Sequence, residues 1–156
     1  MTTTLRAAHR SRKQYVWPLR EDAQTVGHAR AIIRQELSAL TLSPDLIDDA
    51  VLMISELVTN AFMYGTGPYE LMLHIDAKEI ICVVVDGSPI LPAEAPVDVQ
   101  AEHGRGLRIV ARLSDGFYGC HPQRYATQPD LVGKATWFAL PRRDGRCAVL
   151  PIRPGA

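Results

Sequence analysis

The chain has 156 residues, a length that suits one domain with its own hydrophobic core. Its 17 basic and 17 acidic residues cancel, so no field of a single sign is available to hold nucleic acid or an anionic membrane. Three widely spaced cysteines argue against a disulfide framework or a zinc site, and no apolar run reaches the roughly 18 residues of a membrane span. We therefore expect a cytoplasmic protein that binds neither nucleic acid nor membrane.

The N-terminal part of the chain is predicted to contain a strand followed by a helix. Residues 1–13 are expected to form a flexible arm, and the segment QYVWPL after them an edge strand, because Pro18 cannot donate a ladder hydrogen bond. A one-faced helix is predicted over residues 22–40, with Asp22 near its start as the cap. Its apolar positions recur at steps of three and four residues: Ala23, Val26, Ala29, Ile33, Leu37 and Leu40.

A second amphipathic helix carries clear start and stop signals. Ser43 is a capping residue, and Pro44 occupies the first helical position, where a missing amide hydrogen costs nothing. Gly65 and Gly67 end the pattern. The apolar stripe between these signals consists of Leu46, Ala50, Met53, Ile54, Leu57, Val58 and Ala61.

The second half of the chain is predicted to form a hairpin, a long loop, a helix and a second hairpin. Residues 69–76 alternate apolar and polar side chains and residues 79–86 form a β-branched run, so both are predicted strands. The loop from 86 to 103 is longer than most connections in a compact domain, which favours a functional role. The remaining predicted elements are a helix over 104–113, strands over 115–121 and 134–140, and a loose tail over 142–156. This order is α+β, with helices on one face of a largely antiparallel sheet.

Glu56 and Asn60 are the first candidate site residues. They lie one helical turn apart beside the apolar stripe, so their side chains point into one place. A carboxylate there can act as a general base, and a carboxamide oxygen can help to hold a hard cation such as Mg²⁺. The alternative is structural: Glu56 pairs with a surface arginine, and Asn60 hydrogen-bonds a neighbouring backbone.

Two further motifs have the residue types of a nucleotide site. Asp86 ends a buried strand, where its carboxylate can accept a hydrogen bond from an exocyclic amine, although an ordinary Asp-Gly turn would also explain it. Gly104 and Gly106 flank Arg105 at the start of a helix, so backbone N–H groups are presented without an obstructing side chain. Phosphate suits that position, and a simple tight turn is the alternative.

The order of these motifs along the chain resembles that of a known superfamily. ELVTNA, VVVDGSP, GRGLRIV and GKATWFAL are similar to the N, first-glycine, second-glycine and third boxes of the GHKL ATP-binding superfamily. The resemblance covers about residues 15–140 and is closest to the stand-alone anti-sigma-factor serine/threonine kinases and to histidine-kinase-like ATPase-domain regulators. It implies that residues 14–141 form an ATP-binding domain of the Bergerat fold, a two-layer α/β sandwich with a mixed, mostly antiparallel sheet.

The resemblance also implies a role for each matching residue. Glu56 would be the general base, Asn60 the Mg²⁺ ligand and Asp86 the contact to the adenine amine. Residues 87–103 would be the lid over the nucleotide. The implied nucleotide-binding residues are Asn60, Asp86, Gly87, Gly104, Arg105, Gly106, Leu107 and Gly133.

Three of the motifs depart from the superfamily pattern. Where the first glycine box often reads DxGxG, this chain has Asp86-Gly87-Ser88-Pro89, which keeps the acid and loses the paired glycines, and Tyr64 stands where the N box often ends in histidine. Lys134 replaces the threonine that commonly follows the last glycine. Two positions for the Lys134 side chain stay open, on phosphate or toward solvent.

The resemblance implies a function in gene regulation. The chain would phosphorylate Ser or Thr of an anti-sigma-factor antagonist, a small protein with a sulphate-transporter-and-antagonist (STAS)-like fold, and would sequester a sigma factor. Family members of this kind are often homodimers. The alternative is a protein-interaction switch, with or without ATP, that has lost transfer chemistry. A histidine-kinase module is less expected because few residues precede the first helix, and topoisomerase or chaperone ATPases need further domains.

Overall fold

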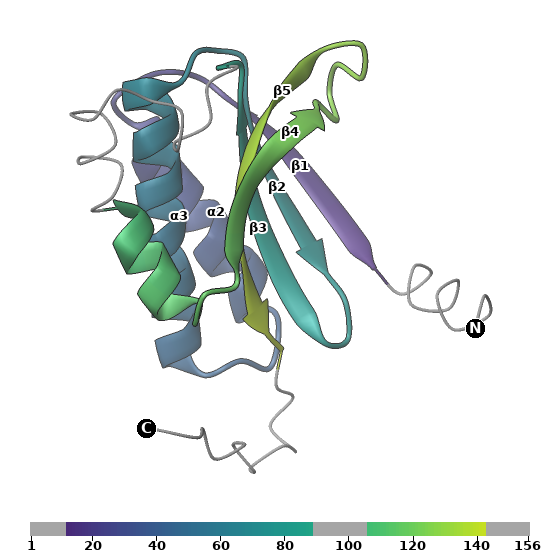
Figure 1. The fold of residues 1–156 in the computed structure, drawn as a ribbon. Coiled ribbons are helices and arrows are strands. Elements are labelled where there is room, and N and C mark those ends of the chain that lie inside the picture. The colour runs from purple at the N-terminus through teal and green to yellow at the C-terminus, as the bar shows by residue number, and fades with distance from the viewer. Residues whose placement is uncertain (1–11, 89–105, 143–156) are drawn as a thin grey trace.

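The computed structural model describes residues 12–88 and 106–142 as a five-stranded sheet with helices on one face (Figure 1). The strand order is β1-β2-β3-β5-β4, and all four pairings are antiparallel. The elements are β1 (Lys13–Leu19), α2 (Thr25–Ser38), α3 (Pro44–Tyr64), β2 (Tyr69–Ile75), β3 (Glu79–Asp86), β4 (Tyr118–Arg124) and β5 (Val132–Pro141), and residues 106–113 form a further helix, unlabelled and green in Figure 1. The predicted α+β fold with a one-sided helical layer is confirmed, and no parallel pair occurs among the described residues.

Parts of four predicted segments lie outside the described residues. These are residues 1–11 of the arm, 89–103 of the loop, 104–105 of the following helix and 143–156 of the tail. Within the described ranges, none of the helices combines the length and apolar character that a membrane span requires.

The helix boundaries follow the local signals at α3 more closely than at α2. The Ser43 hydroxyl accepts a hydrogen bond from the Leu46 amide at 3.2 Å, and Gly65 caps the far end, as predicted. The predicted start of the first helix was wrong, because Asp22 lies in the turn before α2. Its carboxylate accepts from the Gln24 amide at 2.8 Å and the Thr25 hydroxyl at 2.9 Å, so it orders that turn and the helix begins at Thr25.

The larger hydrophobic core lies between the helices and the sheet, and β2 and β3 contribute alternate side chains to it. The opposite face of β2, predicted to be polar, is also buried: Met72 packs in a second cluster with Val83, Val85, Tyr125 and Ala135. The connection between β4 and β5 accounts for the difference. Buried Glu70 accepts hydrogen bonds from the Ala126 amide at 2.7 Å and the Thr127 hydroxyl at 2.8 Å, which ties this connection to β2.

The strand predicted over residues 115–121 begins later, at Tyr118. Asp115 and Gly116 have φ values of 57° and 82°, which lie in the left-handed region and outside strand geometry. The Gly116 amide donates to the Ala111 carbonyl at 2.8 Å and so closes the helix of residues 106–113. The Asp-Gly pair therefore ends a helix and is not the start of a strand.

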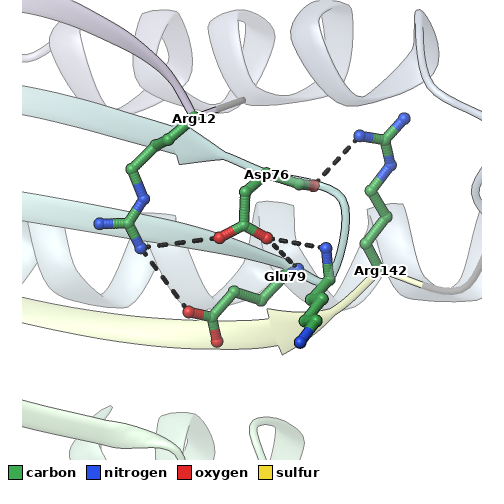
Figure 2. A network of polar contacts seen from close by, with 5 residues as sticks. Arg12, Asp76, Glu79 and Arg142 are labelled. Atoms are coloured by element: carbon green, nitrogen blue, oxygen red, sulfur yellow. Dashed lines mark hydrogen bonds and ion pairs between the residues drawn. The ribbon is translucent and has the colours of Figure 1, made fainter. Parts of the chain in front are cut away.

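A polar network closes the β2–β3 hairpin (Figure 2). The Asp76 carboxylate accepts from the Lys78 and Glu79 amides at 2.7 and 2.8 Å, and Arg12 lies 3.8 Å from the same carboxylate. Arg142 donates to the Asp76 carbonyl at 3.1 Å. β3 runs away from this hairpin for its full length before it reaches Asp86, a path of about 20 Å at the usual rise of a strand. The network thus stabilises the end of the sheet remote from the motifs described below.

Candidate functional site

Glu56 and Asn60 meet the start of the helix of residues 106–113. A Cβ atom placed on Gly106 would lie 2.9 Å from Asn60 Nδ2 and 3.0 Å from Glu56 Oε2. Gly106 is buried, whereas Glu56 and Asn60 are half-buried. The absence of a side chain at Gly106 lets a helix start rest directly on a carboxylate and a carboxamide. Helix starts carry free N–H groups and a partial positive charge, so this corner suits anionic ligands.

A buried ion pair lies where β3 ends. Asp86 is 2% exposed and Lys134 is 5% exposed, and the two residues are direct cross-strand partners on β3 and β5. Asp86 Oδ2 is 3.6 Å from Lys134 Nζ, and Asp86 Oδ1 accepts from the Ser88 amide at 2.8 Å. Burial raises the pKa of Asp86, while Lys134 and the Ser88 amide act in the opposite direction.

Glycines allow three chain segments to close around Asp86. A Cβ on Gly65, at the end of α3, would lie 2.6 Å from Asp86 Cγ, and one on Gly133 would lie 2.5 Å from the Asp86 carbonyl oxygen. The Gly87 amide donates to the Thr66 carbonyl at 2.6 Å. The end of α3, the end of β3 and the start of β5 are therefore held together at a spacing that side chains would prevent.

A small cavity between α3 and the sheet connects these two corners. Asn60 from the first corner and Asp86 and Lys134 from the second line it; the other lining residues are Leu57, Ala61, Val84, Leu107 and Thr136. The lining combines apolar side chains with a few polar ones, the usual composition of a small-molecule site. The cavity volume is about 10 Å³, room for about one water molecule, so a larger ligand requires its lining side chains to move.

Comparison of the sequence with known protein families assigns the chain to one of them. A family model described as histidine kinase-like ATPase domain matches residues 19–127, more than half of the chain. The chain belongs to this family. No curated protein matches the sequence. The family match includes Glu56, Asn60 and Asp86, and it ends before Gly133 and Lys134.

As an ATP-binding member of the GHKL superfamily, this domain brings most of the candidate residues together. Gly106 lies on Glu56 and Asn60, half-buried Leu107 lines the cavity, and Gly87 and Gly133 pack around Asp86. Gly104 and Arg105 lie outside the described residues, as does the predicted lid from 89 to 103. The roles of the candidate residues in this histidine kinase-like ATPase domain stay predictions.

The position of Lys134 is a finding that the sequence left open. Its side chain does not point to solvent, because it is buried against Asp86. The alternation of side chains along β5 could have indicated this burial, because Lys134, Thr136 and Phe138 share the face that packs on the helices. A lysine at an inward position of a central strand requires a partner.

Tyr125 is a second residue of this region that sequence analysis missed. Its ring lies against Gly133, where an added Cβ would approach ring atoms at 2.7 and 2.9 Å, and its hydroxyl donates to the Pro68 carbonyl at 2.7 Å. Burial raises the pKa of Tyr125 to about 12, so it stays a hydrogen-bond donor at neutral pH. The ring thereby holds the start of β5 beside Asp86.

The residues at the Gly106 corner suit a Mg²⁺ ion that arrives with a nucleotide. No group of three or more His, Cys, Asp or Glu side chains that could hold a metal occurs among the described residues. Mg²⁺ bound with a nucleotide takes one or two protein oxygens and completes its shell with phosphate oxygens and water. Asn60 offers a carboxamide oxygen beside Gly106, which fits that requirement.

Replacing Gly106 with alanine is expected to weaken binding of Mg²⁺-ATP by about tenfold, because displaced metal-site side chains typically cost 10- to 100-fold. The new methyl group would press on the ends of the Asn60 and Glu56 side chains, which can swing away. Stability should therefore change by only about 0.5 kcal/mol. Calorimetry and thermal melting check both expectations.

The matched control is Gly27→Ala in α2, where nothing lies within 4 Å of the added Cβ. This variant should gain about 0.5–1 kcal/mol of stability from helix propensity and bind nucleotide as the wild type does. Equal affinities of the Gly106 variant and the wild type would show that the contact does not position the site.

Proposed function

We propose that this chain is a protein serine/threonine kinase that uses ATP and Mg²⁺ to phosphorylate an anti-sigma-factor antagonist. Its membership of the ATP-binding histidine kinase-like family supports the nucleotide part of the proposal. The observation that carries the rest is the close approach of Glu56 and Asn60 to Gly106, beside a cavity that Asn60 and Asp86 both line. A nucleotide lying along the cavity would have its base at Asp86 and its phosphates beside Glu56.

In this proposal Asp86 and the residues beside Gly106 recognise different parts of ATP. Asp86 accepts a hydrogen bond from the adenine amine, and the amides at the helix start around Gly106 and Leu107 face the phosphates. Asn60 is the side chain that would hold Mg²⁺ through its carboxamide oxygen. A bound Mg²⁺ ion supplies neutralisation of the charge on the phosphate oxygens.

Glu56 is the residue that would accept the proton of the acceptor hydroxyl. As the Ser or Thr oxygen bonds to the γ-phosphorus, the bond from that phosphorus to the β–γ bridging oxygen breaks and ADP leaves. The hydroxyl proton passes to the Glu56 carboxylate. Half-buried Glu56 is open enough to be reached by a second protein, whereas Asp86 is enclosed.

The surface of α3 supports a protein substrate. Leu52 and Met63 are 46% and 62% exposed, and they lie one turn before Glu56 and one turn after Asn60 on the same helix. A protein substrate that reaches Glu56 would cover these two side chains. By the motif resemblance, the substrate is an antagonist with a STAS-like fold and the sequestered partner is a sigma factor. The same resemblance implies a cytoplasmic location and allows a homodimer.

Replacing Asn60 with alanine tests the nucleotide site. Wild-type protein should bind ATP in calorimetry with an affinity that Mg²⁺ increases, and the variant should lose at least about tenfold in affinity together with the Mg²⁺ dependence. Gln35→Ala is the control, since it truncates an exposed carboxamide on α2 away from the cavity. Absence of ATP binding by the wild type at millimolar concentration would remove the proposed function.

The second candidate is a protein-interaction switch that binds a partner without phosphoryl transfer. The Asp86–Lys134 ion pair favours it, because the carboxylate that would meet adenine already has a buried partner. ATP binding without phosphorylation of a STAS-like antagonist would support this alternative, and transfer that requires Glu56 would exclude it.

A further inference from the structure

The Asp86–Lys134 pair has a charge arrangement that the packing of the sheet does not explain. Both side chains point toward the helices, they are almost fully buried, and 3.6 Å separates Asp86 Oδ2 from Lys134 Nζ. Replacing such a pair by apolar side chains of similar size is often neutral or stabilising. An apolar pair would thus give the sheet similar stability, and the presence of both charges in the lining of the cavity indicates a ligand.

We propose that Lys134 is a base-reading residue, whose ammonium group donates to N1 of adenine while Asp86 accepts from the exocyclic amine. This inference rests on the proposed nucleotide site and specifies which base that site selects. The adenine edge carries a donor at N6 directly beside an acceptor at N1. Asp86 and Lys134 offer the complementary acceptor and donor from adjacent strands in direct register.

The other residues around the cavity leave this role to Lys134. Among the described lining residues, it is the one that carries a positive charge. Thr136, the next inward residue of β5, has its hydroxyl 3.5 Å from Cys120 Sγ. Asp86 Oδ1 is engaged by the Ser88 amide, so Oδ2, the oxygen facing Lys134, is the better placed acceptor for an incoming amine.

The pair should also reject guanine. In the same pose guanine would place its O6 acceptor against the Asp86 carboxylate and its N1–H donor against the Lys134 ammonium. Both contacts would be repulsive, and buried polar groups left without partners carry a large penalty. A neutral donor in place of Lys134 would not add this charge repulsion, so the lysine sharpens selection of the base.

The test compares ATP, GTP and 1-deaza-ATP, in which a C–H group replaces N1, by calorimetry in the presence of Mg²⁺. Wild-type protein should bind ATP about tenfold to a hundredfold more tightly than 1-deaza-ATP, the range expected for a hydrogen bond from a charged donor. GTP should bind more weakly still. Lys134→Met should bind ATP and 1-deaza-ATP within about twofold of each other, because a thioether donates no hydrogen bond.

The analogue comparison in the wild type needs no variant, so it stands even if Lys134→Met folds poorly. A double variant, Asp86→Asn with Lys134→Met, provides a second background without an unpaired charge and should also fail to distinguish the two adenine ligands. Equal wild-type affinities for ATP and 1-deaza-ATP, or for ATP and GTP, would overturn base reading by Lys134 while leaving ATP binding in place. Failure of all three ligands to bind would overturn both this inference and the proposed function.

Discussion

Replacing Lys134 with methionine is expected to lower the free energy of unfolding by about 3–5 kcal/mol at neutral pH, the usual cost of removing one partner of a buried pair. Methionine keeps the length of the lysine stem, so packing in the sheet changes little. The loss arises because Asp86, only 2% exposed, would lose the opposite charge beside it while its Oδ1 still accepts from the Ser88 amide at 2.8 Å. Urea unfolding followed by circular dichroism measures the difference.

This deficit should shrink as the pH falls. Burial already raises the pKa of Asp86 in the presence of Lys134, and removal of the ammonium should raise it further. A carboxyl whose pKa is raised in the folded state contributes stability below its unfolded pKa of about 3.9 and loses it as pH rises through the folded value. The free energy of unfolding of the variant should therefore approach that of the wild type as the pH is lowered from 7 to 4. A deficit of equal size at both pH values would contradict the ion-pair account.

Two comparison variants separate the ion pair from general damage. Combining Lys134→Met with Asp86→Asn removes both charges and should recover most of the lost stability. Arg34 and Asp48 form a surface pair at 3.0 Å with side chains 53% and 61% exposed, so Asp48→Asn should cost less than about 1 kcal/mol. A Lys134→Met cost no larger than this surface value would show that the pair at the cavity is not energetically coupled.

The sequence could predict the parts of the site that depend on neighbouring residues. Helical periodicity alone brings Glu56 and Asn60 to one place, and Ser43 and Gly65 mark the limits of the helix that carries them. The run of β-branched residues before Asp86 correctly predicted the strand that ends at this residue. Each of these inferences uses interactions that span one or two helical turns or one strand.

The parts that could not be predicted depend on pairing between distant segments. Lys134 meets Asp86 because of the register of β3 against β5, which no local pattern encodes. The buried second face of β2 likewise depends on the hydrogen bonds that Tyr125 and Ala126 donate to Pro68 and Glu70 after the whole sheet has formed. The late start of β4 has a local cause, the positive φ of Asp115, which a residue other than glycine rarely adopts.

Replacing Glu56 with glutamine is expected to slow phosphoryl transfer by about 10²- to 10⁴-fold, the usual contribution of a positioned general base. Glutamine keeps the size of the side chain beside Gly106, so affinity for Mg²⁺-ATP should stay within about threefold of the wild type. The measurement follows transfer of labelled γ-phosphate to a STAS-like antagonist under single-turnover conditions, with ATP binding measured separately. Glu36→Gln on α2 is the control, because that residue does not line the cavity.

The separation of binding from transfer decides between the two candidate functions. A Glu56→Gln protein that binds ATP and transfers phosphate at the wild-type rate would exclude Glu56 as the base. Asp86 could not replace it, since it is almost fully buried and paired with Lys134. If the wild-type protein instead binds Mg²⁺-ATP but transfers no phosphate, it is a nucleotide-binding switch without transfer activity. The Glu56 carboxylate beside Gly106 would then stabilise the start of the helix of residues 106–113.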